Sequence, residues 1–159
     1  MRSPTQGAAL CAAFFIALAV GSGASAASFS RASETRILGA MNRVRVEHGL
    51  RPLHYSGKLR AAARAHSADM MRRGYFGHGS MGRRISGYGV RAPVVGENLA
   101  WGTGPYGVAK VIVQEWLASP EHRAILLRPG FRWVGVGSAV GTFVGRSNAT
   151  VVTADFAGR

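Results

Sequence analysis

The first 27 residues carry a pattern that limits how much of this 159-residue chain can form a folded core. One positive charge, at Arg2, precedes an apolar run over residues 8–20, and an A-x-A sequence follows at residues 24–26. This order is typical of a secretory signal peptide, and the run is short for a transmembrane helix, although an uncleaved anchor is the alternative. We therefore expect a signal peptide over residues 1–26 and export to the periplasm or beyond the cell.

The single cysteine, Cys11, lies inside the predicted signal peptide. The mature chain would contain no disulfide and would be held together by packing alone, which suits a bacterial envelope or secreted protein better than a small eukaryotic extracellular domain. The remaining length can support one core of modest size. We expect a short lead-in over residues 27–32 and one soluble, monomeric domain over residues 33–159.

The chain is strongly basic, with 20 Lys and Arg against 7 Asp and Glu, and only one of these charges, at Arg2, lies in the predicted signal peptide. Such a charge attracts polyanions over long distances, so anionic envelope components are the expected partners of an exported protein. A coding preference for arginine explains the composition equally well, because the basic residues are scattered along the chain. No basic run is interleaved with aromatic residues, and no nucleic-acid partner is expected.

Apolar periodicity and capping residues predict four helices, with Ser56 as an N-cap and Gly74 as a stop for the second one. The helices are expected over residues 33–48, 57–73 and 108–117, and from residue 120 onward. Strands are expected over residues 94–101, 133–140 and 149–156, with a turn at 141–148 and a loop with at most one helical turn at 74–93. Helices on both sides of a small sheet predict an α+β fold, a three-layer α-β-α sandwich.

Glu97 stands out among the few acids because it lies in the apolar sequence VVGENLAW, and no other charged residue occurs between Arg91 and Lys110. Burial of a carboxylate is costly unless a donor, a cation or a metal meets it. His78 and His122 are the best candidates, because imidazole and carboxylate groups move protons and hold metals near neutral pH. From local sequence alone, an internal pair between Glu97 and an arginine is an equally good explanation, and His78 could be a surface histidine.

His122 has a helical placement of its own. Ser119 and Pro120 are preferred at the N-cap and first helical position, which puts His122 in the first turn. The positive end of the helix dipole disfavours a protonated imidazole there and leaves a lone pair for a metal or a substrate proton. Glu121 is favoured at the same end by the dipole and is preferred as a capping residue. His66, on an apolar helix face, is expected to be a buried, hydrogen-bonded core residue.

Seven segments occur in an order and spacing that together are specific. They are LGAMNRVR at 38–45, GLRPL at 49–53, AHSADM at 65–70, FGH at 76–78, GENLA at 96–100, WLASPEHR at 116–123 and VGVG at 134–137. Over about residues 33–156 the chain resembles the CAP superfamily, also called the SCP/PR-1-like family, and in particular its short, cysteine-free bacterial branch. The resemblance implies an α-β-α sandwich with a three-stranded antiparallel sheet.

Members of that family share a cleft lined by two histidines and one or two glutamates, and some bind zinc or another divalent cation through the histidines. By its motifs, the resemblance assigns these positions to His78, Glu97 and His122. Larger members have a second glutamate three residues after a tryptophan, and here that position is Ser119. The second acid is therefore missing unless Glu115 or Glu121 takes its place.

The family includes sterol and lipid binders, so we expect a secreted binding protein whose cleft holds a divalent metal, a small ligand or a lipid. The alternative is a metal-dependent hydrolase acting on peptide or cell-wall material, because two histidines and one glutamate form the ligand set of several catalytic zinc sites. Glu97 would then be a ligand, and Glu121 or Glu115 would have to serve as the general base. Binding is therefore preferred, with a purely structural hydrogen-bonded cluster as a third explanation.

Overall fold

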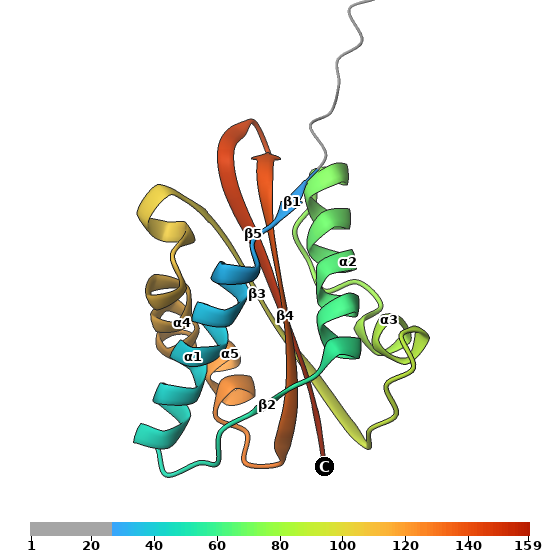
Figure 1. Ribbon diagram of the computed structural model, residues 1–159, viewed down its shortest axis with the longest axis vertical. Helices are drawn as coiled ribbons and strands as arrows, with labels where there is room; N and C mark the ends of the chain where they lie inside the picture. Colours follow the sequence, from blue (N-terminus) through green and yellow to red (C-terminus); the bar gives the residue numbers. More distant parts are fainter. Residues whose placement is uncertain (1–26) are drawn as a thin grey trace, which may run out of the picture.

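The computed structural model describes residues 27–159, so the predicted signal peptide over residues 1–26 lies outside it (Figure 1). The elements in chain order are β1 (Ser28–Phe29), α1 (Arg31–Glu47), β2 (His54–Tyr55), α2 (Gly57–Arg73), α3 (Met81–Gly87), β3 (Val94–Thr103), the 3-10 helix η1 (Gly104–Gly107), α4 (Ala109–Ala118), α5 (Pro120–Leu126), β4 (Phe131–Phe143) and β5 (Arg146–Gly158). No helix in this described part has the length and apolar character needed to span a membrane.

The sheet is built from three long antiparallel strands in the order β4-β5-β3. The short strands β1 and β2 both pair with β4, the first antiparallel and the second parallel. Strand β3 pairs with β5 on one side, and no other strand of the described chain pairs with it, which makes it an edge strand. This edge is where the candidate site forms.

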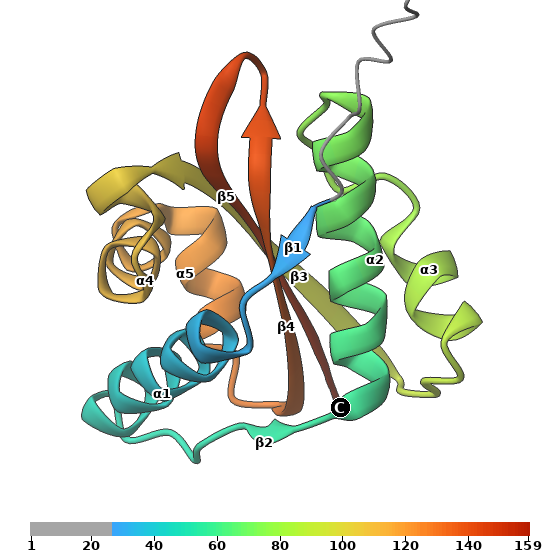
Figure 2. The same cartoon turned by 45° about the horizontal axis from the view of Figure 1, so that its top comes forward.

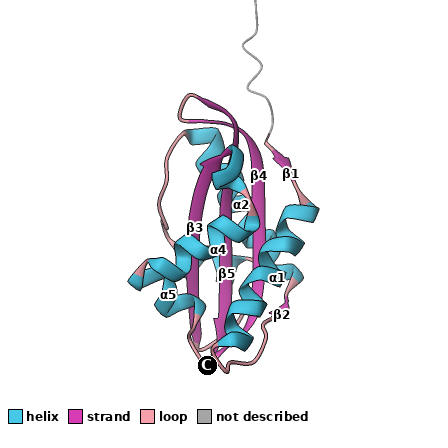
Figure 3. Cartoon of the chain, turned by 90° about the vertical axis from the view of Figure 1, so that its left-hand side faces the viewer, coloured by secondary structure: helices cyan, strands magenta, loops and turns pink. Residues whose placement is uncertain are grey.

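Helices cover both faces of the sheet, as predicted. Helices α2 and α3 lie on one face, and α1, α4 and α5 lie on the other (Figures 1 and 2). Figure 3 shows the second face, with α1, α4 and α5 in front of the three long strands. The predicted three-layer α-β-α sandwich is confirmed, and each layer contributes one wall or the floor of the candidate site.

Two glycines of β4 allow helix α2 to lie directly on the sheet. A Cβ atom added to Gly135 would lie 1.9 Å from the backbone nitrogen of Arg60, and one added to Gly137 would lie 2.4 Å from that of Arg64. Both distances are far below van der Waals contact, so only glycine fits at these positions. The alternation in the V-G-V-G motif therefore puts the glycines toward α2 and the valines toward the opposite core.

A buried arginine joins α1 to the far end of the sandwich. Arg45 is fully buried, and its guanidinium donates hydrogen bonds to four carbonyl oxygens, those of Arg51 (3.1 Å), Leu126 (2.7 Å), Arg128 (3.2 Å) and Phe131 (3.5 Å). Burial lowers its pKa from the ordinary value. These contacts fix the end of α5 and the start of β4 against α1.

Two loop predictions need correction. The segment predicted as loop contains α3, a seven-residue helix, although one helical turn was allowed for there. The turn predicted over residues 141–148 is only two residues long, Val144 and Gly145, because β4 and β5 extend into the glycine-containing stretch. Both residues have positive φ, 42° and 78°, as two-residue hairpin turns of the primed type require, and a valine there gave no turn signal in the sequence.

We predict that Gly135→Ala will lower the free energy of unfolding by about 3 kcal/mol, because the new methyl group must displace the backbone of α2. Urea denaturation followed by circular dichroism measures this change. The matched control is Gly82→Ala, where no heavy atom lies within 4 Å of the added Cβ atom, and it should cause no loss. Equal stability of Gly135→Ala and the wild type would contradict the close contact of α2 with β4.

Candidate functional site

Glu97 is held by two partners on the α2 and α3 side of the sheet. Its side chain is only 1% exposed. One carboxylate oxygen, Oε1, accepts a hydrogen bond from His78 Nδ1 at 2.7 Å, and the other, Oε2, accepts one from Arg84 Nη2. The sequence suggested either a histidine partner or an internal arginine pair for Glu97, and the structure contains both contacts.

A second buried carboxyl group lies beside Glu97. Asp155 is directly opposite Glu97 in the register of β3 with β5, is fully buried, and lies 3.4 Å from Arg84 Nη2 through its Oδ1 atom. Burial raises the pKa of Glu97 to about 7, although Arg84 opposes the change. Burial and the neighbouring negative charge of Glu97 raise the pKa of Asp155 to about 8. Like charges this close cannot both ionise easily, so the pair retains a proton near neutral pH.

His66 supports the loop that carries His78. It is 4% exposed, and its Nε2 atom lies 2.9 Å from the Gly77 carbonyl oxygen and 3.7 Å from Glu97 Oε2. Burial, and secondarily the charge of Arg84, lower the pKa of His66 to about 4, so the ring is neutral at physiological pH. Its Nε2–H group donates to the Gly77 carbonyl and fixes the residue before His78. The prediction of a buried, hydrogen-bonded histidine agrees with this geometry.

His122 is held differently from His78. Its Nδ1 atom lies 2.8 Å from the hydroxyl oxygen of Ser119, whose side chain makes no capping bond to the helix backbone. Ser119 is the N-cap residue of α5 and Pro120 its first helical residue, as predicted, but the Ser119 hydroxyl contacts the imidazole and not the helix backbone. Burial lowers the pKa of His122, the charge of His78 lowers it further, and Glu121 opposes the change. This direction agrees with a neutral ring, although burial and not the helix dipole is its main cause.

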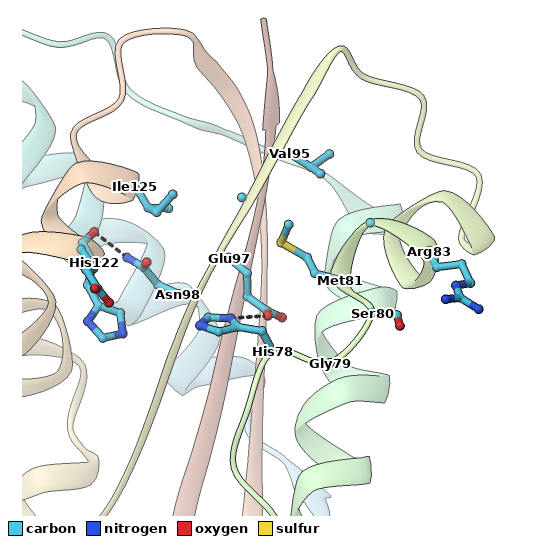
Figure 4. Close-up of a pocket in the computed structure, with 13 residues that line it drawn as sticks. His78, Gly79, Ser80, Met81, Arg83, Val95, Glu97, Asn98, His122 and Ile125 are labelled. Carbon is cyan, nitrogen blue, oxygen red and sulfur yellow. Dashed lines mark hydrogen bonds and ion pairs between the residues drawn. The ribbon is translucent and has the colours of Figure 1, made fainter.

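The two histidines line one cavity of about 670 Å³ at the open edge of β3 (Figure 4). Residues 95–98 of β3 form its floor, the segment from His78 to Arg83 forms one wall, and Glu121, His122 and Ile125 of α5 form the other. Figure 4 shows the His78 ring extending from its loop toward the α5 wall. The cavity thus brings together three predicted site residues and the auxiliary Glu121.

The other two auxiliary candidates lie elsewhere. Glu115 is exposed on α4 and does not line the cavity. Ser119 does not line it either, and contributes only through its contact with His122. Glu121 is therefore the only one of the three auxiliary candidates that lines the cavity, and a further buried acid, Asp155, lies next to Glu97 outside the cavity lining.

Each residue of the G-E-N sequence, Gly96, Glu97 and Asn98, makes a different contact that requires its residue type. A Cβ atom on Gly96 would lie 2.7 Å from the Phe131 ring, so glycine lets β3 pack on that core residue. Glu97 faces the opposite side of the sheet and binds His78. The Asn98 side chain donates to the carbonyl oxygen of His122 at 2.9 Å and ties α5 to β3. Consecutive residues thus position both histidines from opposite faces of one strand.

Sequence reasoning missed Arg84 and Asp155 as site residues. Arg84 lies in the segment predicted as loop and is one of many arginines, so no local signal distinguished it. Asp155 did have a signal, because it is an acid inside the apolar strand sequence VVTADFA, which is the same pattern that drew attention to Glu97.

The geometry does not present Glu97 as a third metal ligand. Across residues 27–159 no group of three His, Cys, Asp or Glu side chains is arranged to hold a metal ion. Both oxygens of Glu97 are already engaged, by His78 and Arg84. The donors that face the cavity are the Nε2 atoms of His78 and His122, for which no partner occurs in the described part of the chain, since each ring is held through Nδ1. The residues therefore fit a cation site with two histidine ligands and free coordination positions better than a site filled by protein ligands.

Comparison with known proteins agrees with the fold and the motifs. Residues 38–156 match the sequence model of CAP, the cysteine-rich secretory protein family, and the chain therefore belongs to the CAP family. The only cysteine, Cys11, lies outside the matched residues, so the domain is formed here without any cysteine.

Two curated relatives come from Bacillus subtilis (strain 168). The chain is 34% identical over 118 residues to the uncharacterized protein YkwD, an alignment that covers 71% of this chain and 45% of YkwD. It is 36% identical over 110 residues to the uncharacterized membrane protein YlbC, covering 66% of this chain and 31% of YlbC. The chain thus spans less than half the length of either relative.

Solved structures show the same fold. An extracellular protein containing an SCP domain from Bacillus anthracis superposes with a TM-score of 0.69 at 27% identity, covering 80% of this chain and 41% of that one. An outer surface protein from Borrelia burgdorferi superposes with a TM-score of 0.71 at 18% identity, covering 84% of this chain and 98% of that one. The second likeness supports the fold alone.

We predict that the free energy of unfolding falls by roughly 1–2 kcal/mol between pH 6.5 and 8.5, and that Asp155→Asn flattens this decline. The ordinary pKa values of Glu97 and Asp155 are 4.5 and 3.8, and the folded values are about 7 and about 8. The folded protein therefore binds more protons than the unfolded chain in this range and loses stability as pH rises. His66 has a lowered pKa, so its opposing effect is confined to pH below about 6.5.

Urea denaturation at three pH values between 6.5 and 8.5 measures the slope. Glu47→Gln is the control, because it removes an exposed carboxylate and should leave the slope unchanged. An identical slope in the wild type and Asp155→Asn would contradict a raised pKa in the buried pair.

Proposed function

We propose that this CAP-family protein acts outside the cytoplasm as a binding protein, and that its cavity holds a divalent cation such as zinc through His78 and His122. The observation that carries this proposal is the orientation of the two rings, each held through Nδ1 by a protein oxygen. Metal-binding histidines commonly have this arrangement, because the hydrogen bond at one nitrogen directs the other toward the metal. The Glu97 carboxylate also fixes the tautomer of His78, whereas the Ser119 hydroxyl can accept or donate and fixes only the direction of the His122 ring.

Glu97 orients His78 in this proposal and is not a ligand. The proton that the buried pair retains belongs on Asp155, whose pKa is the higher of the two, which leaves Glu97 ionised. An ionised carboxylate only accepts hydrogen bonds, so the 2.7 Å contact places a proton on His78 Nδ1 and the lone pair on Nε2. Hydrogen bonding to a carboxylate also makes the imidazole a better donor to a metal. Glu97 in turn is fixed by Arg84, so the orientation of His78 does not depend on a mobile side chain.

Two protein ligands leave several coordination positions for water or for a bound small molecule. Zinc sites that stabilise folds have four protein ligands, whereas sites that exchange ligands keep positions open. The arrangement thus supports a weak, exchangeable cation that helps to hold a second ligand. An extracellular location is supported by the predicted signal peptide and by the extracellular Bacillus anthracis relative.

Metal-dependent hydrolysis of peptide or cell-wall material is the second candidate, and one observation favours it. Glu121 lines the same cavity as the histidines, so a carboxylate is available near a bound cation. However, Glu121 is exposed in the first turn of α5 and no hydrogen bond of the described residues fixes its side chain. A general base must be held within reach of the proton that it removes, and therefore binding is preferred.

We predict that the purified, chelator-treated protein binds zinc at pH 7.5. The double variant His78→Ala/His122→Ala should weaken binding more than about 100-fold, which exceeds the effect of losing a residue that only hydrogen-bonds to a metal ligand. Isothermal titration calorimetry measures the affinity. The control is His48→Ala, which removes an exposed histidine on the far end of α1. Equal, negligible zinc binding by the wild type and the double variant would rule out the cation site.

Glu97→Gln separates an orienting role from a ligand role. The glutamine oxygen can still accept the His78 hydrogen bond, so we expect zinc affinity to fall only about tenfold. Loss as large as that of the double histidine variant would show that the carboxylate is itself a ligand. If the zinc-loaded wild type also cleaves casein or peptidoglycan, and Glu121→Gln does not, the hydrolase candidate replaces the binding one.

A further inference from the structure

The floor of the cavity is a free sheet edge. Strand β3 pairs with β5 along its whole length, and its other edge has no strand partner in the described chain. Four consecutive residues of this strand, 95–98, line the cavity. An open strand edge presents a row of backbone donors and acceptors, which can pair with another extended chain.

The direction of the backbone groups follows from a single contact on β3. The carbonyl oxygen of Leu99 accepts a hydrogen bond from the indole nitrogen of Trp116 at 2.8 Å, so this carbonyl is directed away from β5. In an antiparallel pair, the N–H and C=O of one residue lie on the same side, and the side alternates along the strand. The backbone groups of Glu97 and Val95 are therefore directed away from β5, into the cavity.

These outward groups have no partner among residues 27–159. Apart from the pairing with β5, no backbone hydrogen bond reaches Val95 or Glu97, and the only side chain of this part of the protein that bonds to the β3 backbone is Trp116. Glu97 is 5% exposed as a residue, whereas its side chain is 1% exposed. The exposure that it retains is therefore mainly on its backbone, as a free edge requires.

The walls limit the length of chain that fits. Trp116 closes the edge at Leu99, and the open floor of four residues corresponds to about 13 Å of strand. The two outward residues, Val95 and Glu97, are separated by one strand repeat, which matches the spacing of donors and acceptors in an extended peptide. A lipid chain or a sugar does not have backbone donors and acceptors at this repeat.

We propose that the cavity binds an extended peptide segment that adds to the sheet by pairing with the backbone of Val95 and Glu97. Its side chains then alternate between the wall of His78 and Arg83 and the wall of His122 and Ile125. Recognition of this kind takes its affinity from main-chain hydrogen bonds and its selectivity from the walls. An extended peptide is then the ligand of the cavity described under the proposed function, and the proposal rests on that function. It requires that the cavity binds a ligand, and it does not require the cation.

Hydrogen exchange in the protein without ligand tests the free edge. The amides of Val95 and Glu97 should exchange much faster than those of Gly96 and Asn98, which bond to β5. Equal protection at all four amides, or the reverse order, would overturn the proposal.

Selection of linear octapeptides from a phage-displayed library on the purified protein, with EDTA present, tests binding itself. Enriched peptides are then synthesised with single N-methyl groups at each backbone amide. Methylation at alternate amides should weaken binding by about tenfold, because each removes one ladder hydrogen bond, and methylation at the intervening amides should have little effect. Failure to enrich any peptide, or binding that no N-methyl group weakens, would overturn the proposal.

Val95→Pro removes the outward N–H donor, and Val95→Ala is its matched control with the donor retained. We expect the proline variant to bind the selected peptide about tenfold more weakly than the alanine variant. The peptide N-methylation series decides the outcome if the proline variant does not fold. Peptide binding is measured in EDTA, and zinc binding is measured without peptide. Failure of the sheet-edge proposal and failure of the cation site are therefore separate results.

Discussion

The ion pair between Arg84 and Glu97, with Asp155 beside it, is the interaction on which the candidate site depends. One guanidinium contacts carboxyl groups on two neighbouring strands, and its Nη1 atom donates to the backbone carbonyl of His78. Two buried carboxylates without a cation would repel each other and would each carry the cost of leaving water. Arg84 and one retained proton lower this cost, and the same contacts join α3, β3 and β5 at the wall of the cavity.

The fold could be predicted well from local signals. Ser56 caps α2 by accepting a hydrogen bond from the Leu59 amide, and Gly74 ends the helix in the left-handed conformation, as the sequence indicates. The three-layer arrangement could be predicted from the number and order of the expected helices and strands. The short hairpin turn could not be predicted, because Val144 adopts positive φ only under the constraint of two long paired strands. Ser119 is the N-cap residue of α5 as predicted, but the contact of its hydroxyl with the His122 ring could not be predicted from capping preferences.

The site was only partly accessible from the sequence. Glu97 was marked by its apolar surroundings, and the family motifs assigned His78 and His122, which the structure places around one cavity. Asp155 has the same apolar surroundings, but its place opposite Glu97 depends on the strand register between two residues that are 58 positions apart in the sequence. Arg84 had no signal, because its role arises only when α3 packs against β3. Long-range pairing, and not residue chemistry, is the information that a single sequence lacks.

The contacts of Arg45 change what the arginine content of this protein means. Its charge is surrounded by main-chain carbonyl dipoles, and no carboxylate of the described residues neutralises it. A planar guanidinium can reach four such oxygens at once, whereas the ammonium group of a lysine cannot. Arg45 and Arg84 are therefore part of the internal architecture and are not available to a polyanion at the surface. The formal charge of +13 therefore does not count the arginines that can contact an approaching envelope polymer, because Arg45 and Arg84 contribute charge without a surface contact.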